Sequence, residues 1–359
     1  MAKKLAPDKV LFTTVALLIG LGLVMVYSAS SAHVQGKAIN PFLVKQAIAA
    51  VLGLGGMLVA MHVDYRRLRH PAVVYTALGG SLFLLLGVLF APALNNTRRW
   101  FFIGGISVQP AELAKLALVV FLAYQIERKE DRVNSRELLL PCALASALVA
   151  GLVLLEPDMG TAVLIVATAA AMLFLAGLSW KWVGATAVAA VPIAWFAVFS
   201  APYRRERVLA FLHPERDPLG AGFQALQSLI AVGSGGVLGL GPGQSVQKLY
   251  FLPYPHTDFI YAIIAEELGM VGGLLVVALF AVLLWRGARA ALAAPDAFGR
   301  YLAYGLTAAI VLQALLNVSV AVALFPTKGI PLPFVSYGGC SLVVSMTACG
   351  LLLNVSQHG

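Results

Sequence analysis

The chain contains a long apolar segment that begins directly after an acidic residue. Residues 252–285 read LPYPHTDFIYAIIAEELGMVGGLLVVALFAVLLW. The part that follows Asp258 is long enough to cross a bilayer, which takes roughly 17–25 residues of an α-helix. It nevertheless carries Glu266 and Glu267 along its length. Because ionisable residues inside a membrane are costly, they usually mark function.

The rest of the chain is similarly apolar. Of its 359 residues, 60% are hydrophobic and 11% are charged, and the mean hydropathy is +0.88, whereas about a quarter of a soluble domain is charged. We therefore expect an all-α polytopic membrane protein, with one integral membrane domain over residues 1–359. The first apolar run is too long for a signal peptide and has no clear cleavage site. The expected spans are ten apolar runs, at about 10–31, 42–61, 72–91, 109–126, 138–155, 161–178, 182–200, 259–285, 302–325 and 335–353.

Lysine and arginine set the expected orientation, because cytoplasmic loops are enriched in them. With the N-terminus inside, 14 of the 25 Lys and Arg residues fall in inner segments and 10 in outer ones, while Lys115 lies within a span. We therefore expect both termini in the cytoplasm and a long outward loop at residues 201–257. The outward arginines oppose the rule and suggest an anionic ligand at that face. We predict no nucleic-acid partner, since the net charge of +9 is mostly this inside bias.

Polar residues interrupt the membrane pattern at the start of the fourth span. Glu112 and Lys115 stand three residues apart, on one face of a helix. They form either a self-neutralising pair near the interface or the lining of an outward cavity, and the cost of intramembrane charge favours the cavity. Arg98 and Arg99, beside Trp100, either anchor a loop at the headgroups or bind phosphate oxygens with their fork of donors.

The fifth span ends in LLEPDMGTA, which places Glu156 and Asp158 in a tight outer turn. Turn chemistry explains a Pro, an Asp and a Gly at this spacing. Contact with a metal or a sugar is the less favoured interpretation.

Two outer loops add further candidates. Residues 201–257 are too many for a structureless connection, and FQALQSLIAVG has a helical period with Gln224 and Gln227 on one side. A short helix at the interface and a surface for a sugar-phosphate head group both fit this segment. The last outer loop, FPTKGIPLPFVSYGGCS, surrounds Lys328 and Ser336 with prolines and glycines. Irregular backbone at membrane depth indicates that it lines a cavity.

Asp258 has two interpretations. Two prolines rule out a regular helix before His256, so Thr257 or Asp258 is the natural N-cap of the following span. A carboxylate beside a histidine at a cavity mouth, facing basic residues, is also a candidate general base. The segment alone slightly favours the cap, and the basic cluster around Lys115 favours the base.

The chain resembles the SEDS family of shape, elongation, division and sporulation proteins, to which FtsW, RodA and SpoVE belong. Two segments, SVQKL and PTKG, look more like FtsW, while IPLPFVSYGG occurs readily in the RodA branch. The family often has a glutamate near Tyr254, and its absence here weakens any mechanism that needs a second carboxylate at that point. The resemblance runs through essentially the whole chain and rests on seven ordered motifs: NNTRRW, QPAELAK, EPDMGTA, DPLGAGFQALQSLIAVGSGG, GPGQSVQKL, LPYPHTDFIYAIIAEELG and PTKGIPLPFVSYGG.

The resemblance implies a peptidoglycan glycosyltransferase of the bacterial cytoplasmic membrane, with an outward active site, serving cell division or elongation. Its substrate would be lipid II, the undecaprenyl-pyrophosphate-linked disaccharide peptide. Its partners would be membrane lipid and a class B penicillin-binding protein, which is a transpeptidase. The essential aspartate of the family falls on Asp258. Its polar cavity residues fall on Arg98, Arg99, Glu112, Lys115, Lys248 and Ser336, to which we add Gln227, His256, Thr257 and Lys328 as candidate substrate contacts.

We expect an inverting transfer with one base. Glycosidases need both an acid and a base, but a lipid-linked pyrophosphate leaves readily once its charge is balanced. Asp258 would take the proton of the acceptor sugar's 4-hydroxyl, which attacks the anomeric carbon of an α-linked donor to give a β linkage. Arg98, Arg99 and Lys115, with a divalent cation such as Mg²⁺ or Mn²⁺, would stabilise the pyrophosphate. Glu112 would hold Lys115, and Glu266 would make supporting polar contacts.

Two other functions compete with this one. A lipid II flippase would carry inverted repeats with paired broken helices; matching halves are not evident, and the polar residues cluster toward one face. A scaffold would activate a partner synthase through the loop at residues 201–257.

Overall fold

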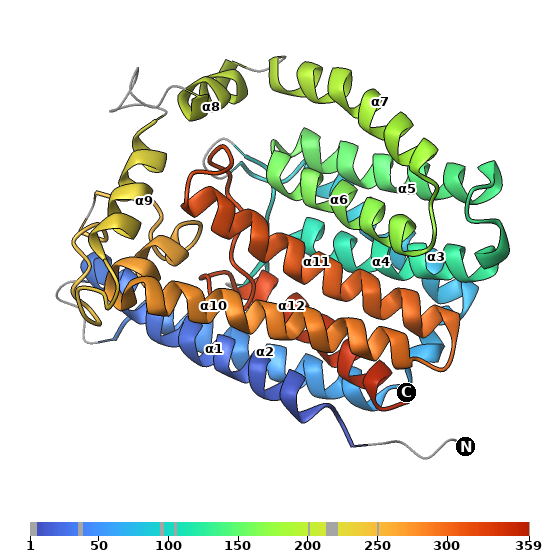
Figure 1. The fold of residues 1–359 in the computed structure, drawn as a ribbon, viewed down its shortest axis with the longest axis horizontal. Coiled ribbons are helices and arrows are strands. Elements are labelled where there is room, and N and C mark those ends of the chain that lie inside the picture. Colours follow the sequence, from blue (N-terminus) through green and yellow to red (C-terminus); the bar gives the residue numbers. More distant parts are fainter. Residues whose placement is uncertain are drawn as a thin grey trace.

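The computed structural model describes residues 6–34, 39–93, 97–103, 106–199, 202–212, 222–249 and 251–358. The described chain is almost entirely helical, and its strands are one short antiparallel pair, β1 (Phe101–Ile103) and β2 (Ile106–Val108). Figure 1 shows a bundle of long helices that run roughly alongside one another.

Each of the ten predicted spans coincides with one helix, although several ends are shifted by a few residues. Seven described helices, α1, α2, α3, α5, α10, α11 and α12, are long and apolar enough to cross a membrane, and α6 is a shorter apolar helix. The all-α polytopic fold is therefore confirmed. The ten helices are α1 (Lys9–Ser30), α2 (Pro41–His62), α3 (Pro71–Val88), α4 (Pro110–Arg128), α5 (Arg136–Leu155), α6 (Met159–Leu175), α7 (Trp180–Phe199), α10 (Ile260–Ala293), α11 (Ala297–Ala321) and α12 (Gly339–Ser356). Three short 3-10 helices connect some of them, η1 (Ser31–Val34), η2 (Tyr65–Arg69) and η3 (Glu130–Arg132).

The long loop between α7 and α10 contains two helices of its own. The predicted short helix is present as α9 (Phe223–Ser234), and α8 (Pro202–Leu212) was not predicted. Residues 213–221 of this loop, with Arg216, lie outside the described residues. After α9 comes a stretch that we call the glycine loop, residues 235–249. Figure 1 shows α7 and α8 at the edge of the molecule, outside the main bundle.

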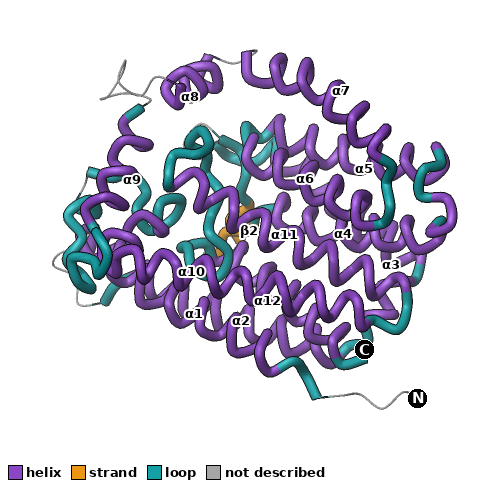
Figure 2. The backbone as a smooth tube through the Cα atoms, in the orientation of Figure 1, coloured by secondary structure: helices purple, strands orange, loops and turns teal. Residues whose placement is uncertain are grey.

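The two ends of the bundle differ. The start of α1 and the end of α12 lie at one end, as an even number of spans requires, and α9 and the glycine loop lie at the opposite end (Figure 2). The end that carries the termini is expected to face the cytoplasm, and this orientation stays a prediction.

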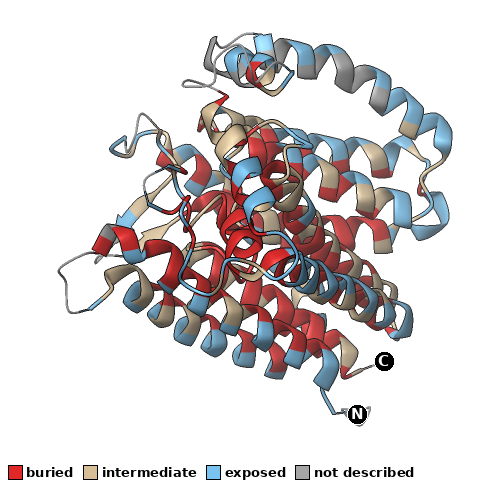
Figure 3. Cartoon of the chain, turned by 60° about the vertical axis from the view of Figure 1, so that its left-hand side comes forward, coloured by how far each residue is buried: buried red, intermediate tan, exposed pale blue. Residues whose placement is uncertain are grey.

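Burial follows the helix faces that point into the bundle. The most extensive packing is between α2 and α12, between α10 and α11, and between α3 and α4, and Figure 3 shows buried residues along these inner faces. Large apolar side chains are exposed on the outside, among them Leu17, Val59, Phe83, Leu144 and Leu274. An apolar outer surface of this kind suits a bilayer and would be a liability in water.

The helix α10 is interrupted in its first half, and the glycine loop makes backbone hydrogen bonds at the interruption. At Gly269 in α10 the backbone leaves helical geometry, with φ of 66° and ψ of −165°. The N–H of Leu240 donates to the carbonyl of Glu266 (3.0 Å), and the N–H of Met270 donates to the carbonyl of Gly236 (2.9 Å). Backbone groups at membrane depth need such partners. The loop therefore supplies the hydrogen bonds that α10 loses at the break.

We predict that this repair depends on the absence of a side chain at Gly239. Its φ is +83°, and an added Cβ would lie 2.2 Å from the carbonyl oxygen of Glu267. Gly236 also has a positive φ, +55°, but a Cβ there would meet nothing within 4 Å. Gly239→Ala should therefore lower the thermal unfolding temperature of the purified protein well beyond Gly236→Ala, which carries only the backbone cost of about 1–2 kcal/mol. Equal effects of the two substitutions would contradict this packing.

Candidate active site

The described residues surround a cavity of about 600 Å³. Its walls come from α8, from the starts of α4, α6 and α9, and from the loops that precede α4, α6, α10 and α12. Its polar lining includes Arg99, Gln109, Glu112, Asp158, Gln224, Thr257, Asp258 and Lys328. Residues from six distant parts of the sequence thus meet around one space.

Asp258 lines this cavity and does not cap the helix that follows it. α10 begins at Ile260, and its N-cap is Phe259, whose side chain makes no capping hydrogen bond. The prediction of Thr257 or Asp258 as the N-cap is therefore wrong, because the chain continues past both before it becomes helical. Asp258 lies beside the last outer loop: a Cβ added to Gly329 would be 3.2 Å from its Oδ2 atom.

Arg99 reaches the cavity from the loop before β1. Its Nε atom donates to the carbonyl of Glu156 (2.9 Å), and an Nη2–H donates to the carbonyl of Pro157. Its Nη1 atom is 3.8 Å from the carboxylate of Asp158. These contacts fix a guanidinium group at the cavity wall, where it can meet a phosphate oxygen.

Asp158 also holds the start of α6. Its carboxylate accepts hydrogen bonds from the backbone N–H of Thr161 (3.1 Å) and from the hydroxyl of the same residue (2.9 Å). The side-chain amide of Gln109 donates to it at 3.3 Å. The turn interpretation of this segment is therefore confirmed, with Asp158 as the N-cap.

Glu112 and Lys115 form the ion pair that the sequence indicates, at 3.0 Å. Lys115 also donates to the side-chain oxygen of Gln313 on α11, at 2.7 Å. Glu112 lines the main cavity, whereas Lys115 lines only an adjoining cavity of about 30 Å³, together with Glu112 and Gln313. The two interpretations of the pair thus each hold in part, and the prediction that Lys115 lines the main cavity is wrong.

Five further predicted contacts do not line this cavity either. The guanidinium of Arg98 turns away and donates to the carbonyl of Leu89 (2.7 Å), and on α9 Gln224 takes the place at the cavity that we expected for Gln227. Gln224 and Gln227 are three residues apart on one side of the helix, so the sequence alone could not decide which of the two reaches the cavity. The five residues are Arg98, Gln227, Lys248, His256 and Ser336.

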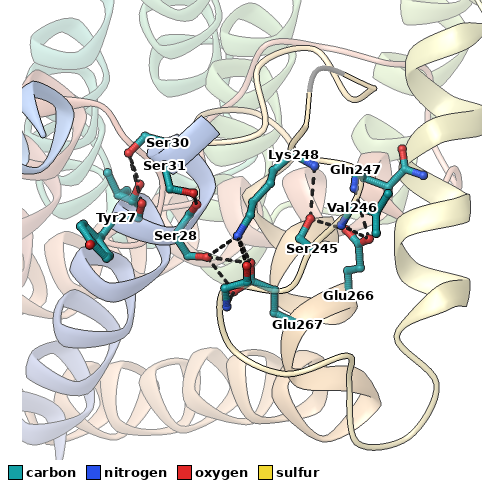
Figure 4. A network of polar contacts seen from close by, with 12 residues as sticks. Tyr27, Ser28, Ser30, Ser31, Ser245, Val246, Gln247, Lys248, Glu266 and Glu267 are labelled. Atoms are coloured by element: carbon teal, nitrogen blue, oxygen red, sulfur yellow. Dashed lines mark hydrogen bonds and ion pairs between the residues drawn. The ribbon is translucent and has the colours of Figure 1, made fainter. Parts of the chain in front are cut away.

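Lys248 belongs to a separate buried network, shown in Figure 4. Its ammonium lies 2.8 Å from the carboxylate of Glu267 and 3.1 Å from the hydroxyl of Ser28, and it donates to the carbonyl of Gly243 (2.7 Å). Lys248 therefore neutralises a carboxylate of α10 and ties the glycine loop to α1. In this arrangement these contacts of its ammonium are all within the protein, and substrate binding by Lys248 stays a prediction.

Glu266 makes the supporting contacts expected of it. Its carboxylate accepts hydrogen bonds from the hydroxyl of Ser245 (2.5 Å) and from the backbone N–H groups of Val246 (2.9 Å) and Gln247 (3.3 Å). The two glutamates of α10 thus both bind the glycine loop, as Figure 4 shows. This explains why adjacent acidic residues occur in a membrane helix.

His256 and Ser336 support the segment that carries Asp258. The His256 ring packs against Phe42 and Tyr337, with ring centroids 4.7 Å and 5.6 Å away. The hydroxyl of Ser336 donates to the carbonyl of Thr257 at 2.6 Å. Of the predicted contacts, Arg99, Glu112, Thr257, Lys328 and Asp258 meet at the cavity.

Two polar residues of α11 were missed. The side-chain amides of Gln313 and Asn317 donate to carbonyls of the last outer loop, at Pro331 (2.9 Å) and Ile330 (2.7 Å). The available signal was their position, four residues apart inside an apolar span, which places both on one helix face.

The comparisons with known proteins agree with this geometry. Residues 8–359 match the FTSW_RODA_SPOVE model, described as a cell cycle protein family. The chain belongs to this family. It is 42% identical over 358 residues to a probable peptidoglycan glycosyltransferase FtsW of Geobacter metallireducens, which covers 98% of this chain and 95% of the relative. It is 41% identical to stage V sporulation protein E of Bacillus subtilis, with 99% and 98% of the two chains covered.

Solved structures of the FTSW_RODA_SPOVE family share the fold. The rod shape determining protein RodA of Thermus thermophilus is 32% identical, with a TM-score of 0.71 over 98% of this chain and 97% of that one. A chain from a structure described as "Structural coordination of polymerization and crosslinking by a peptidoglycan synthase complex" is 36% identical, with a TM-score of 0.80 and 98% of both chains covered. The resemblance inferred from the ordered motifs is thereby confirmed.

Two ionisable groups of the loops around the cavity have shifted pKa values. Burial raises the pKa of Glu156 to about 8; the charge of Asp158 adds to this shift and that of Arg99 opposes it. Both carboxyl oxygens of Glu156 are buried without a hydrogen-bond partner among the described residues. Burial lowers the pKa of Lys328, and Asp158 opposes that shift.

We predict that the ionisation of Glu156 destabilises the folded protein increasingly as the pH rises. An unfolded glutamate ionises near 4.5, whereas this one stays protonated up to about 8, so the folded state binds the extra proton and stability falls as pH rises across that window. The slope is about 1.4 kcal/mol per pH unit. Glu156→Gln should raise the unfolding temperature relative to wild type more at pH 8 than at pH 5. The exposed Glu137→Gln is the control, and a difference for Glu156→Gln that does not change with pH would contradict the shift.

We also predict that Lys248 and Glu267 are coupled. Lys248→Met leaves a buried carboxylate without its cation, which costs about 3–5 kcal/mol. The double variant Lys248→Met/Glu267→Gln should lose less stability than Lys248→Met alone, because it leaves no unpaired charge. Thermal unfolding of the wild type, Lys248→Met, Glu267→Gln and the double variant measures this, and simple additivity of the two substitutions would show that the pair is not energetically coupled.

Proposed function

We propose that this protein is a peptidoglycan glycosyltransferase that polymerises lipid II at the outer face of the cytoplasmic membrane, with Asp258 as the general base. The observation that carries the proposal is that Asp258 shares a cavity of about 600 Å³ with Arg99 and Lys328. This transfer requires a carboxylate that accepts a proton. It also requires cations that bind the diphosphate, and Arg99 and Lys328 supply two. The names of the relatives, which include peptidoglycan glycosyltransferase FtsW, support the same reaction.

The step joins two lipid-linked sugars. Asp258 takes the proton of the acceptor's 4-hydroxyl, and the oxygen forms a bond to the anomeric carbon of the donor. The bond from that carbon to the diphosphate oxygen breaks, and its electron pair leaves with the lipid diphosphate. Attack opposite the leaving group converts an α donor into a β linkage. Because the leaving group needs charge stabilisation rather than a proton, one carboxylate suffices.

The cations assigned to the diphosphate differ from those expected from the sequence. Arg99 and Lys328 line the cavity, whereas Arg98 and Lys115 do not. Because burial lowers the pKa of Lys328, an anionic diphosphate beside it would favour its protonated form. Lys115 acts on the site indirectly, through its ion pair with Glu112.

A divalent cation remains part of the proposal. The described residues hold no group of three or more His, Cys, Asp or Glu side chains arranged as a metal site. Magnesium ions usually bind through one or two carboxylates together with substrate phosphates. A cation bound in that way would neutralise diphosphate oxygens alongside Arg99 and Lys328.

We propose a class B penicillin-binding protein as the partner, supported by the similarity to a chain of a peptidoglycan synthase complex. Relatives include FtsW and stage V sporulation protein E, and a similar structure is RodA. The motifs SVQKL and PTKG favour a division role, and fluorescent localisation to midcell rather than the sidewall tests this.

Asp258→Ala should strongly slow glycan polymer formation by the purified protein supplied with lipid II and its partner. Loss of a general base typically costs 10²–10⁴-fold, so the rate should fall by about that factor. Asp131→Asn, at an exposed position on η3, is the matched control and should polymerise normally.

A wild-type rate for Asp258→Ala would remove the proposed base. Movement of head groups across vesicles without polymer would support a flippase instead. Normal growth of cells that carry only Asp258→Ala would support a scaffold.

A further inference from the structure

The backbone that carries Asp258 is held at three successive carbonyl groups. None of these carbonyls belongs to a helix, since α10 begins only at Ile260. Each one accepts a hydrogen bond from a different donor of the neighbouring segments. The pairs are His256 with the N–H of Tyr337 (2.9 Å), Thr257 with the hydroxyl of Ser336 (2.6 Å), and Asp258 with the side-chain amide of Asn317 (2.8 Å).

Asn317 makes a second contact with the same nitrogen. It lies on α11, is 1% exposed, and donates also to the carbonyl of Ile330 at 2.7 Å. Both hydrogens of the amide can therefore be engaged, one by the carbonyl of Asp258 and one by the carbonyl of Ile330. One side chain joins the segment of Asp258 to the loop that carries Lys328.

We propose that Asn317 is a positioning residue for glycosyl transfer, which sets Asp258 relative to Lys328 through their backbones. The inference rests on the proposed function of Asp258 as the base. The spacing is tight, because a Cβ added to Gly329 would lie 3.2 Å from Asp258 Oδ2. A displacement of about 1 Å at a reacting group can cost about 10²-fold in rate, so a tie between these two segments controls the rate without contacting substrate.

The chemistry of Asn317 fits positioning better than packing. Its Oδ1 atom is buried without a hydrogen-bond partner among the described residues. An unpaired buried acceptor costs about 1–3 kcal/mol, and an apolar side chain of similar size would avoid that cost. The two donated hydrogen bonds are what the amide contributes at this position.

Gln313 extends the same arrangement one turn along α11. Its amide nitrogen donates to the carbonyl of Pro331 at 2.9 Å, and its oxygen accepts from Lys115 at 2.7 Å. The ion pair of Lys115 with Glu112 is thereby connected to the loop that Asn317 holds. Lys115 is therefore linked through Gln313 to the loop that carries Lys328, although Lys115 does not line the main cavity.

The test is the kinetics of lipid II polymerisation by Asn317→Leu, which removes both donors at similar volume. We expect kcat to fall by about 10–100-fold with KM little changed, because the substrate contacts remain. Thr307→Val is the matched control: Thr307 is 2% exposed on the same helix, and its hydroxyl has no hydrogen-bond partner among the described residues. This variant should retain the wild-type kcat.

Two further measurements separate positioning from a loss of folding. Asn317→Leu should unfold at a lower temperature than Thr307→Val, because two carbonyl groups lose their donor, but it should remain folded at the assay temperature. In an Asp258→Ala background, Asn317→Leu should not reduce the residual rate further, because the group it positions is gone. Should Asn317→Leu not accumulate in membranes, Asn317→Ala provides the same readouts.

The outcomes distinguish this inference from the function on which it rests. An inactive Asp258→Ala with a fully active Asn317→Leu overturns the positioning role alone. A raised KM with unchanged kcat, or a loss of rate that persists undiminished in the Asp258→Ala background, also overturns it. An active Asp258→Ala would instead remove the proposed base.

Discussion

The carbonyl groups of residues 256–258 lie outside any helix, and in apolar surroundings each has to find a donor. The donors come from α11 and from the loop before α12. The same requirement recurs at Gly269, where the glycine loop replaces the hydrogen bonds that α10 loses. The first part of α10, residues 260–268, therefore lies between two stretches of non-helical backbone, residues 256–258 and Gly269. Satisfying these backbone groups is what brings distant loops together, and the cavity forms where those loops meet.

The buried charges divide into two kinds. Lys248 is sealed against Glu267 and Ser28, and Lys115 is paired with Glu112 at 3.0 Å. A cation held so closely by a carboxylate serves the fold, because separating a buried pair costs several kcal/mol. Arg99 is held mainly by carbonyl oxygens, with its nearest carboxylate contact at 3.8 Å. Carbonyl groups orient a guanidinium without cancelling its charge, which leaves that charge available to an anionic ligand.

Hydropathy predicted the spans because the bilayer imposes length and polarity on each one separately. The motifs also placed Asp258, Arg99 and Lys328 in one site. Sequence reasoning failed where the outcome depends on pairing across the chain: the contact between Lys248 and Ser28 joins residues 220 positions apart, and neither residue specifies the other. Asn317 and Ser336 donate to backbone carbonyls, which any residue can offer, so the sequence does not show which partner either side chain meets. Arg98 and Arg99 are adjacent, and only the path of the loop decides which one faces the cavity.

Fixing an acid by its backbone differs from fixing it by its carboxylate. A cation placed directly against a catalytic carboxylate favours its charged form and so weakens it as a base. Hydrogen bonds to the carbonyls of His256, Thr257 and Asp258 restrain position without adding a formal charge beside the carboxylate. Arg99 and Lys328 line the same cavity, and in the proposed reaction these two cations would act on the leaving group. The loop between α11 and α12 carries Lys328, and its residues Ser336 and Tyr337 also donate hydrogen bonds to the segment of Asp258. A change in this loop would therefore displace the proposed base and the cation together.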